Sequence, residues 1–253
     1  MIRKRVTIAV YEAWKVHASG ALEVNRYTRG AIASGELVSQ KNKTASQTNS
    51  AVKRRKRAVI TSTSEPVRAF CALTLDDAAT QSLDKAIHAE RRRMDSFNWV
   101  EPEKWHVTLK FFREVPRDRL EDLARGLKAV AGQPIATSIR GVGGVPDLRA
   151  PRSLWVGIDD PNNALIKLYR RVNAISAELG FEPEDRRFKP HITIARPKKG
   201  RTHPVARELT PLMGQNIADT VLRELVLMTS EFHPDGPVFT PVMRTTLGGG
   251  ATF

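Results

Sequence analysis

The chain has almost no cysteine, no long apolar run and fewer acidic than basic residues. Cys71 is the only cysteine among 253 residues, which excludes an internal disulfide and fits a reducing compartment, the cytoplasm. No apolar run approaches the roughly 18 residues that span a bilayer, so we expect neither a membrane helix nor a membrane partner. No Cys/His cluster has the spacing of metal ligands, so we expect no metal and no cofactor. The 41% hydrophobic content is nevertheless enough for a real core.

The charge is basic and unevenly distributed. The chain holds 41 Lys and Arg against 27 Asp and Glu, a formal net charge of +14. Residues 1–66 contain 13 basic and 4 acidic residues, a net charge of +9, and the remaining 187 residues carry only +5. A cationic chain favours polyanionic partners, of which nucleic acid is the first candidate.

The first 65 residues do not have the composition of a folded domain. Residues 34–64 are rich in Ser, Thr, Lys, Arg and Asn, and residues 53–57 form the basic run KRRKR. Such a segment buries too little apolar surface to offset its chain entropy, so we predict a disordered extension over 1–65. An alternative is that translation begins nearer Val52, Val59 or Val67. We predict a catalytic domain over 66–247 and a flexible tail over 248–253.

From Pro66 onward the hydrophobic pattern becomes regular. Helical spacing and capping residues predict three helices, at 76–94, 118–130 and 162–179. Asp76 is expected to cap the first of them, and Leu83 and Ile87 are expected along its apolar side. Period-two alternation and apolar runs predict strands at 67–75, 97–100, 105–112, 135–142, 154–158, 191–196, 220–232 and 238–246. Strand–helix–strand units thus occur twice. We predict an α+β fold with two pseudo-symmetric lobes of antiparallel β-sheet, outer helices and a central cleft.

One four-residue pattern occurs twice, as His106-Val107-Thr108-Leu109 and His191-Ile192-Thr193-Ile194. The alternation predicts two half-buried strands, each with its His and Thr on one face and its aliphatic residues on the other. Two imidazoles with neighbouring hydroxyls suit acid–base chemistry on an anionic centre such as phosphate. The alternative is two ordinary strands that each point a histidine outward.

Two basic residues follow the His and Thr pairs. Lys110 and Arg196 carry positive charge close to the histidines and either give electrostatic support to a bound phosphate or are ordinary surface residues. Phe111 alternates away from His106 and is expected to pack in the core.

The two motifs and their flanks resemble the two-histidine phosphoesterases, and most closely their LigT-like branch. That branch comprises the RNA 2′,3′-cyclic phosphodiesterases, also called 2′-5′ RNA ligases. The resemblance covers about residues 66–246 in family order. It rests on HVTLKF at 106–111, PHITIAR at 190–196, RAFCAL at 68–73, WVEPEK at 99–104, LWVGI at 154–158, GFEPEDRRF at 180–188 and GPVF at 236–239. Phe112-Arg113 departs from the Leu-Gly pair that is usual in the family.

The resemblance implies a metal-independent hydrolase that opens 2′,3′-cyclic phosphate ends of RNA and leaves a 2′-phosphate. It implies that His191 is the base that activates water and that His106 is the acid that protonates the 3′-oxygen. It also implies that Thr108 and Thr193 bind the non-bridging phosphate oxygens. The residues alone leave the two histidine roles interchangeable. The implied partner is RNA or an oligonucleotide with a cyclic phosphate end, handled by a monomer.

Two other functions fit the same sequence. One is the same chemistry on a small cyclic nucleotide or on the cyclic phosphate of ADP-ribose. The other is a non-catalytic RNA-binding protein that uses the basic N-terminal segment, whose binding would be sensitive to salt and indifferent to both histidines.

Overall fold

The computed structural model describes residues 65–184, 187–233 and 236–248. The chain divides into two units, Met1–Arg54 and Arg55–Phe253, and only the second contains described residues. The predicted extension (1–65) and tail (248–253) therefore lie outside the described residues, except for Glu65 and Gly248. Among the residues described, no helix is both long enough and apolar enough to cross a membrane.

The predicted helices and most predicted strands form close to the expected positions. The four helices are α1 (Asp77–Arg93), α2 (Leu120–Ala129), α3 (Ala164–Glu178) and α4 (Ala206–Leu209). The nine strands are β1 (Pro66–Thr74), β2 (Phe97–Trp99), β3 (His106–Pro116), β4 (Ile135–Val145), β5 (Ser153–Ile158), β6 (His191–Pro197), β7 (Asn216–Leu222), β8 (Glu224–His233) and β9 (Gly236–Thr246). Short 3₁₀ turns lie at Pro102–Lys104, Arg117–Arg119 and Thr210–Leu212.

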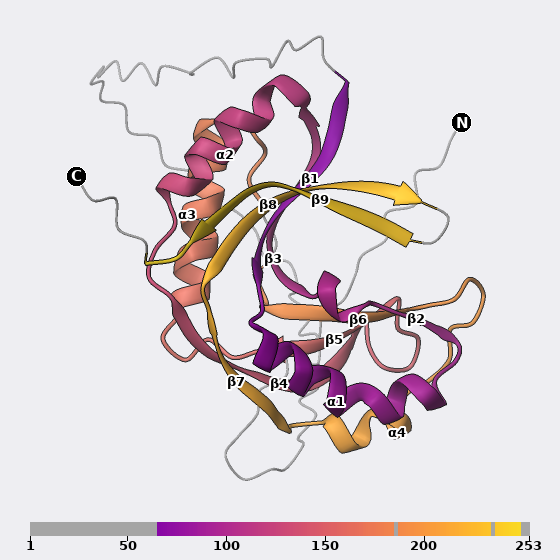
Figure 1. The fold of residues 1–253 in the computed structure, drawn as a ribbon. Helices are drawn as coiled ribbons and strands as arrows, with labels where there is room; N and C mark the ends of the chain where they lie inside the picture. The colour runs from indigo at the N-terminus through magenta and orange to yellow at the C-terminus, as the bar shows by residue number, and fades with distance from the viewer. Residues whose placement is uncertain (1–64, 185–186, 234–235, 249–253) are drawn as a thin grey trace, which may run out of the picture. The chain divides into compact units, whose positions relative to one another are not determined.

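The strands form one curled antiparallel sheet that consists of two halves (Figure 1). The first half-sheet has the order β3-β1-β8-β9, and the second has the order β6-β5-β4-β7, with β2 also paired to β6. Each half therefore begins with the strand that carries one His-x-Thr motif. The two motif strands meet through a single residue pair, Val107 with Ile192. The predicted α+β fold with two similar antiparallel halves is confirmed.

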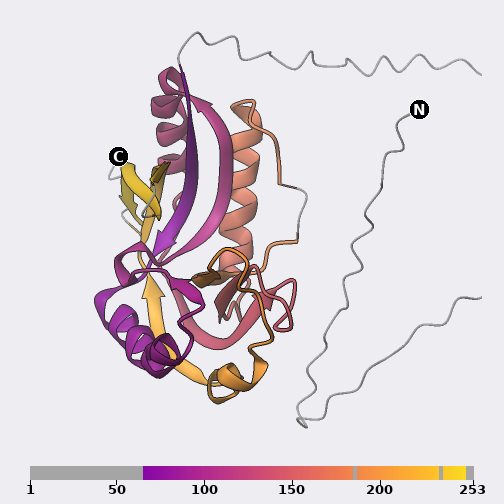
Figure 2. The same cartoon turned by 90° about the vertical axis from the view of Figure 1, so that its right-hand side faces the viewer.

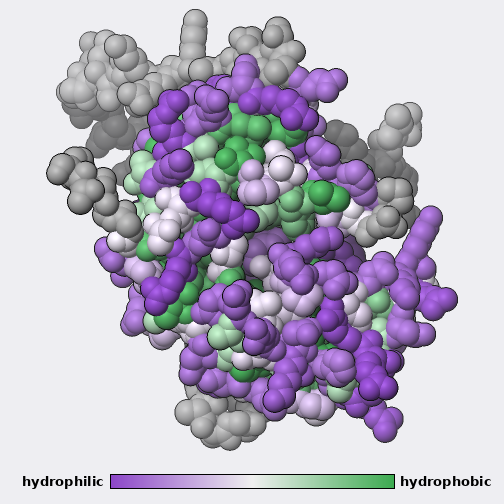
Figure 3. All heavy atoms as spheres, viewed as in Figure 1, coloured by the Kyte–Doolittle hydropathy of each residue, from purple (hydrophilic) through white to green (hydrophobic). Residues whose placement is uncertain are grey.

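The helices lie on the outside of the curled sheet (Figures 1 and 2). Helix α3 packs on β3, α2 packs on α3 and β9, and α1 packs on β7 of the second half-sheet. As predicted, the Asp76 carboxylate caps α1 by accepting a hydrogen bond of 2.7 Å from the Ala79 amide. Leu83 and Ile87 of α1 are fully buried. Viewed as in Figure 3, the surface is mostly hydrophilic, with apolar side chains in separate patches.

One predicted strand is wrong. Residues 220–232 form no continuous strand, because β7 ends at Leu222 and β8 begins at Glu224. β7 pairs with β4 in the second half-sheet, whereas β8 pairs with β1 in the first. The chain thus crosses between the halves at Arg223. Hydrophobic alternation records burial on a sheet and carries no information about which strand is the neighbour, so the crossing was invisible in the sequence. Helix α4, a single turn, was also missed.

Candidate active site

The two His-x-Thr motifs lie on one face of the sheet, at the point where its halves meet. Val107 and Ile192 are paired and fully buried, so both point to the helix-covered side. Neighbouring side chains in a strand point to opposite faces, which places His106, Thr108, His191 and Thr193 together on the other side. In an antiparallel register the two histidines are diagonal neighbours, and in a regular sheet such residues lie about 7–8 Å apart, with a somewhat shorter Cβ–Cβ distance. That separation accommodates a phosphate group between the imidazoles.

Both imidazoles are oriented by the same local contact. The Nδ1 atom of His106 donates to the Lys104 carbonyl over 2.7 Å, and Nδ1 of His191 donates to the Lys189 carbonyl over 2.8 Å. A carbonyl oxygen only accepts, so each Nδ1 carries a proton. Nε2 of each ring is thereby left to take or give a proton at the site. Both carbonyls belong to the residue two positions before the histidine, so the contact repeats in the two halves.

The surroundings of the two histidines differ. The His106 ring stacks on Phe70 with 4.8 Å between centroids, and the edge of Phe239 approaches it at 5.6 Å. Burial among these rings lowers the pKa of His106 below its ordinary value, because a buried imidazolium loses hydration. The hydrogen bond to Lys104 opposes this shift, whereas the charges of Arg196 and His191 reinforce it. These two charges therefore lie close to His106.

A β-bulge in each motif strand decides which following residue reaches the site. The pairing of β1 with β3 skips Leu109, since Cys71 pairs with Lys110 and Ala72 with Thr108. β5 and β6 show the same irregularity, at Ile194 in β6. Two consecutive residues are buried at each bulge, and the side-chain alternation is then inverted.

This inversion corrects two expectations. Phe111 is not in the core: it is 57% exposed and lies 5.8 Å from the Phe70 ring. Lys110 gives no electrostatic support to the site, because it points to the opposite side, where it is buried. Its ammonium group donates to Asn173 Oδ1 on α3 over 3.1 Å and to the Glu182 carbonyl over 2.6 Å. Arg196 occupies the position in β6 that Phe111 has in β3, and its charge acts on His106.

An aromatic residue that the sequence reasoning missed lies beside His191. Trp155 of β5 pairs with Thr193, and its ring lies 6.2 Å from the His191 ring. A Cβ atom at Gly143 would overlap the indole, so the ring lies flat over this glycine of β4. The pattern of the short strand LWVGI indicated only a half-buried strand. The orientation of the indole depends on its contact with Gly143 of β4, which the sequence does not reveal.

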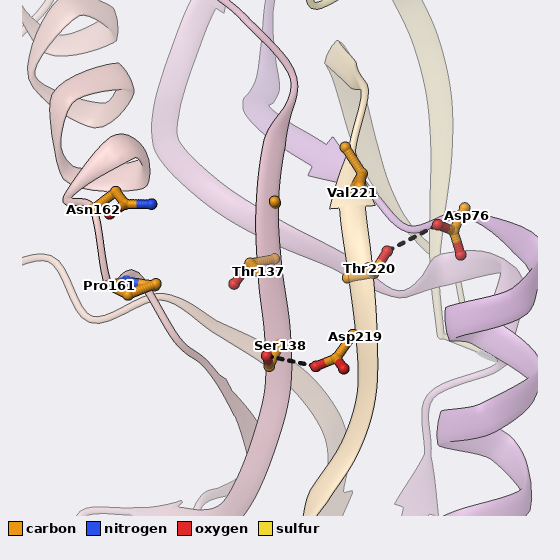
Figure 4. Close-up of a pocket in the computed structure, with 9 residues that line it drawn as sticks. Asp76, Thr137, Ser138, Pro161, Asn162, Asp219, Thr220 and Val221 are labelled. Atoms are coloured by element: carbon orange, nitrogen blue, oxygen red, sulfur yellow. Dashed lines mark hydrogen bonds between the residues drawn. The ribbon is translucent and has the colours of Figure 1, made fainter.

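The second half-sheet also contains a surface pocket of about 540 Å³, away from the histidines (Figure 4). It is lined by Asp76, Ala136, Thr137, Ser138, Pro161, Asn162, Asp219, Thr220 and Val221. Thr220 donates a hydrogen bond to Asp76 over 2.9 Å, and Ser138 donates one to Asp219 over 2.7 Å. These carboxylates are already engaged by neighbouring hydroxyls, so the chemistry is expected at the two histidines.

The residues of the site itself comprise two imidazoles, two hydroxyls and a guanidinium. No group of three or more His, Cys, Asp or Glu that could hold a metal ion occurs among residues 65–184, 187–233 and 236–248. The set can transfer protons at two points on opposite sides of an anion while donating hydrogen bonds to it.

Comparison with known proteins agrees with this geometry. The chain is 32% identical over 177 residues to an RNA 2′,3′-cyclic phosphodiesterase of Methanothermobacter thermautotrophicus, which covers 69% of this chain and 95% of the relative. It is 31% identical over 173 residues to the protein of the same name from Archaeoglobus fulgidus. That match covers 68% of this chain and 96% of the relative.

Solved structures of the same kind share the fold. The protein TT0787 of Thermus thermophilus superposes with a TM-score of 0.59 at 27% identity, covering 71% of this chain and 97% of that one. E. coli LigT complexed with 3′-AMP superposes with a TM-score of 0.57 at 25% identity. That match covers 73% of this chain and 99% of the LigT chain. The model of the family described as LigT like Phosphoesterase matches twice, over residues 76–155 and 156–239, with one His-x-Thr motif in each match. This chain therefore belongs to the LigT-like phosphoesterase family.

Proposed function

We propose that the protein is an RNA 2′,3′-cyclic phosphodiesterase that acts through His106 and His191. The observation that carries the proposal is the single Val107–Ile192 pair, which brings two imidazoles and two threonines onto one face. The relatives named RNA 2′,3′-cyclic phosphodiesterase cover the same part of the chain and support this substrate.

The reaction needs one proton acceptor and one proton donor. His191 in its neutral form takes a proton from water, and the water oxygen forms a bond to phosphorus. The bond from phosphorus to the 3′-oxygen breaks, and protonated His106 gives its proton to that oxygen. The products are a free 3′-hydroxyl and a 2′-phosphate. The lowered pKa of His106 makes its imidazolium a stronger acid than an ordinary one and also reduces the protonated fraction at neutral pH.

The other polar groups of the site stabilise the negative charge. The hydroxyls of Thr108 and Thr193 donate hydrogen bonds to the non-bridging oxygens, where charge increases as water attacks. Arg196, whose charge acts on His106, neutralises part of the charge of the phosphate. Exposed Phe111 offers a flat apolar surface beside the histidines for the terminal base.

The direct test is turnover of an oligoribonucleotide that ends in a 2′,3′-cyclic phosphate. We expect conversion to the 2′-phosphate, identified by its resistance to a 3′-nucleotidase, and we expect the rate to survive EDTA. A protein that only binds RNA would leave the substrate intact. Formation of a 3′-phosphate, or loss of activity with EDTA, would contradict the proposal.

The burial of His106 predicts the pH dependence. Because desolvation favours its neutral form, His106 protonates at a pH below the ordinary histidine value of about 6.5. His106 must be protonated to act as the proton donor, so the limb of the bell-shaped kcat/KM profile that falls with rising pH should lie at lower pH than an ordinary histidine would give. Replacing Phe239 with Ala admits water to His106, raises its pKa and moves that limb to higher pH. An unchanged limb in Phe239→Ala would show that the limb belongs to another group.

We further propose that the enzyme acts as a monomer in the cytoplasm. Cys71 is fully buried in β1, and burial raises the pKa of its thiol, so it is unsuited to form an intermolecular disulfide.

A further inference from the structure

The site face of the first half-sheet continues well beyond the histidines. From His106, the register leads to Phe70 and Phe111 and then to the next row, which contains Arg68 on β1 and Ser230 on β8. Arg113 of β3 follows Phe111 by two residues and is exposed; a register irregularity places it, together with exposed Glu114, opposite Arg68. Successive rows on one face of a sheet lie about 7 Å apart, roughly one nucleotide of an extended strand.

An exposed cation–aromatic pair lies at the far end of these rows. The guanidinium carbon of Arg68 lies 4.8 Å from the centroid of the Phe232 ring. Phe232 is 71% exposed, the highest exposure among the large hydrophobic residues described. Neither Arg68 nor Arg113 forms an ion pair with a carboxylate elsewhere in the described part of the chain. Two arginines and one aromatic ring are therefore available to a ligand on the sheet face that carries His106.

We propose that Arg68, Arg113 and Phe232, which we call the upstream strip, bind the nucleotides that precede the cyclic phosphate. The inference rests on the proposed function and makes its substrate a single-stranded RNA of several nucleotides, in place of a mononucleotide. The strip lies one row beyond Phe70 and Phe111 on the site face, and its two guanidinium groups complement a phosphodiester backbone. A base stacked on an aromatic ring together with a cation on the backbone is the usual means of holding single strands without sequence preference.

The experiment compares two substrates, cytidine 2′,3′-cyclic phosphate and a pentaribonucleotide that ends in the same group. We expect the wild-type enzyme to have a kcat/KM at least about tenfold higher for the pentanucleotide. Phe232→Ala and Arg68→Ala should each remove most of this preference and leave turnover of the mononucleotide unchanged. Phe232→Tyr keeps the ring and should keep the preference. Arg68→Ala should also reduce the dependence of pentanucleotide binding on salt.

Arg125→Ala is the matched control. Arg125 lies on α2, its side chain is 75% exposed, and it pairs with Asp122 of the same helix. The variant removes one surface charge outside the upstream strip and should leave both substrates unaffected. An equal loss for Arg125→Ala and Arg68→Ala would reduce the effect to net charge and overturn the proposal.

Binding provides a readout that does not depend on catalysis. Fluorescence anisotropy with a labelled pentanucleotide that ends in a 2′-phosphate should show weaker binding to Phe232→Ala. If neither cyclic phosphate is turned over but this difference in binding remains, the proposed function fails and the upstream strip stands. Equal binding by wild type and Phe232→Ala overturns the strip even in an active enzyme. A change in oligomeric state on replacing Phe232, without a change in RNA binding, would assign the ring to self-association and also overturn it.

Discussion

Replacing either His106 or His191 with Ala should lower kcat/KM for a cyclic phosphate end by about a hundredfold to ten-thousandfold. Each imidazole carries out one of the two proton transfers, and no other titratable side chain of the site can take its place. The double variant should lose far less than the product of the two single losses, because the two groups act in one step. Initial rates on a terminally labelled oligonucleotide measure all three losses.

The control for these variants is His88→Ala. His88 is exposed on α1 and should be dispensable. Because His106 stacks on Phe70, a change to Ala could also loosen the fold, so His106→Asn and thermal unfolding of each variant separate catalysis from stability. A folded His106 or His191 variant with full activity would rule out two-histidine catalysis.

A substrate with sulfur in place of the bridging 3′-oxygen should distinguish the acid from the base. A thiolate leaves without protonation, so the general acid is no longer needed in that substrate, whereas the base is still needed to activate water. We expect His106→Ala to recover most of its lost rate on the 3′-thio cyclic phosphate and His191→Ala to recover none.

The opposite pattern would reverse the two roles. Rescue of His191→Ala alone would make His191 the acid, in line with the preference of buried His106 for its neutral form in the free enzyme. Rescue of neither variant would mean that protonation of the leaving group does not limit the rate. Turnover of the 3′-thio substrate by the wild-type enzyme shows that the sulfur is tolerated. The rate of each variant on this substrate is divided by that wild-type rate.

Local pattern predicted most of the fold. The Asp76 cap and the buried positions Leu83 and Ile87 of α1 were foreseen, because helix periodicity and capping depend on neighbours in the sequence. The faces of both motif strands were foreseen for the same reason. Residues 220–232 were interpreted wrongly, since only the tertiary structure shows that β7 and β8 have partners in different halves.

Residues just after each motif show the limit of that reasoning. Charge suggested Lys110 as support for a phosphate, and alternation from His106 placed Phe111 in the core; the bulge at Leu109 puts Lys110 on the buried side and exposes Phe111. The doubled phenylalanine at 111–112 already broke the alternation, but it did not indicate where an extra residue would be accommodated. Arg196 reaches the site because β6 contains a bulge at the equivalent position.

The sequence by itself determined the chemistry: two histidines, each followed by a threonine on the same strand face, in a chain suited to a polyanionic partner. Alternation of side chains is a property of a single strand and can be read without knowing the fold. Only the tertiary structure decided that the two motifs adjoin through Val107 and Ile192, that Phe70 and Phe239 enclose one imidazole, and that Arg68 meets Phe232 on the same sheet face. Those contacts join residues far apart in the chain, and their register depends on strand pairing and bulges.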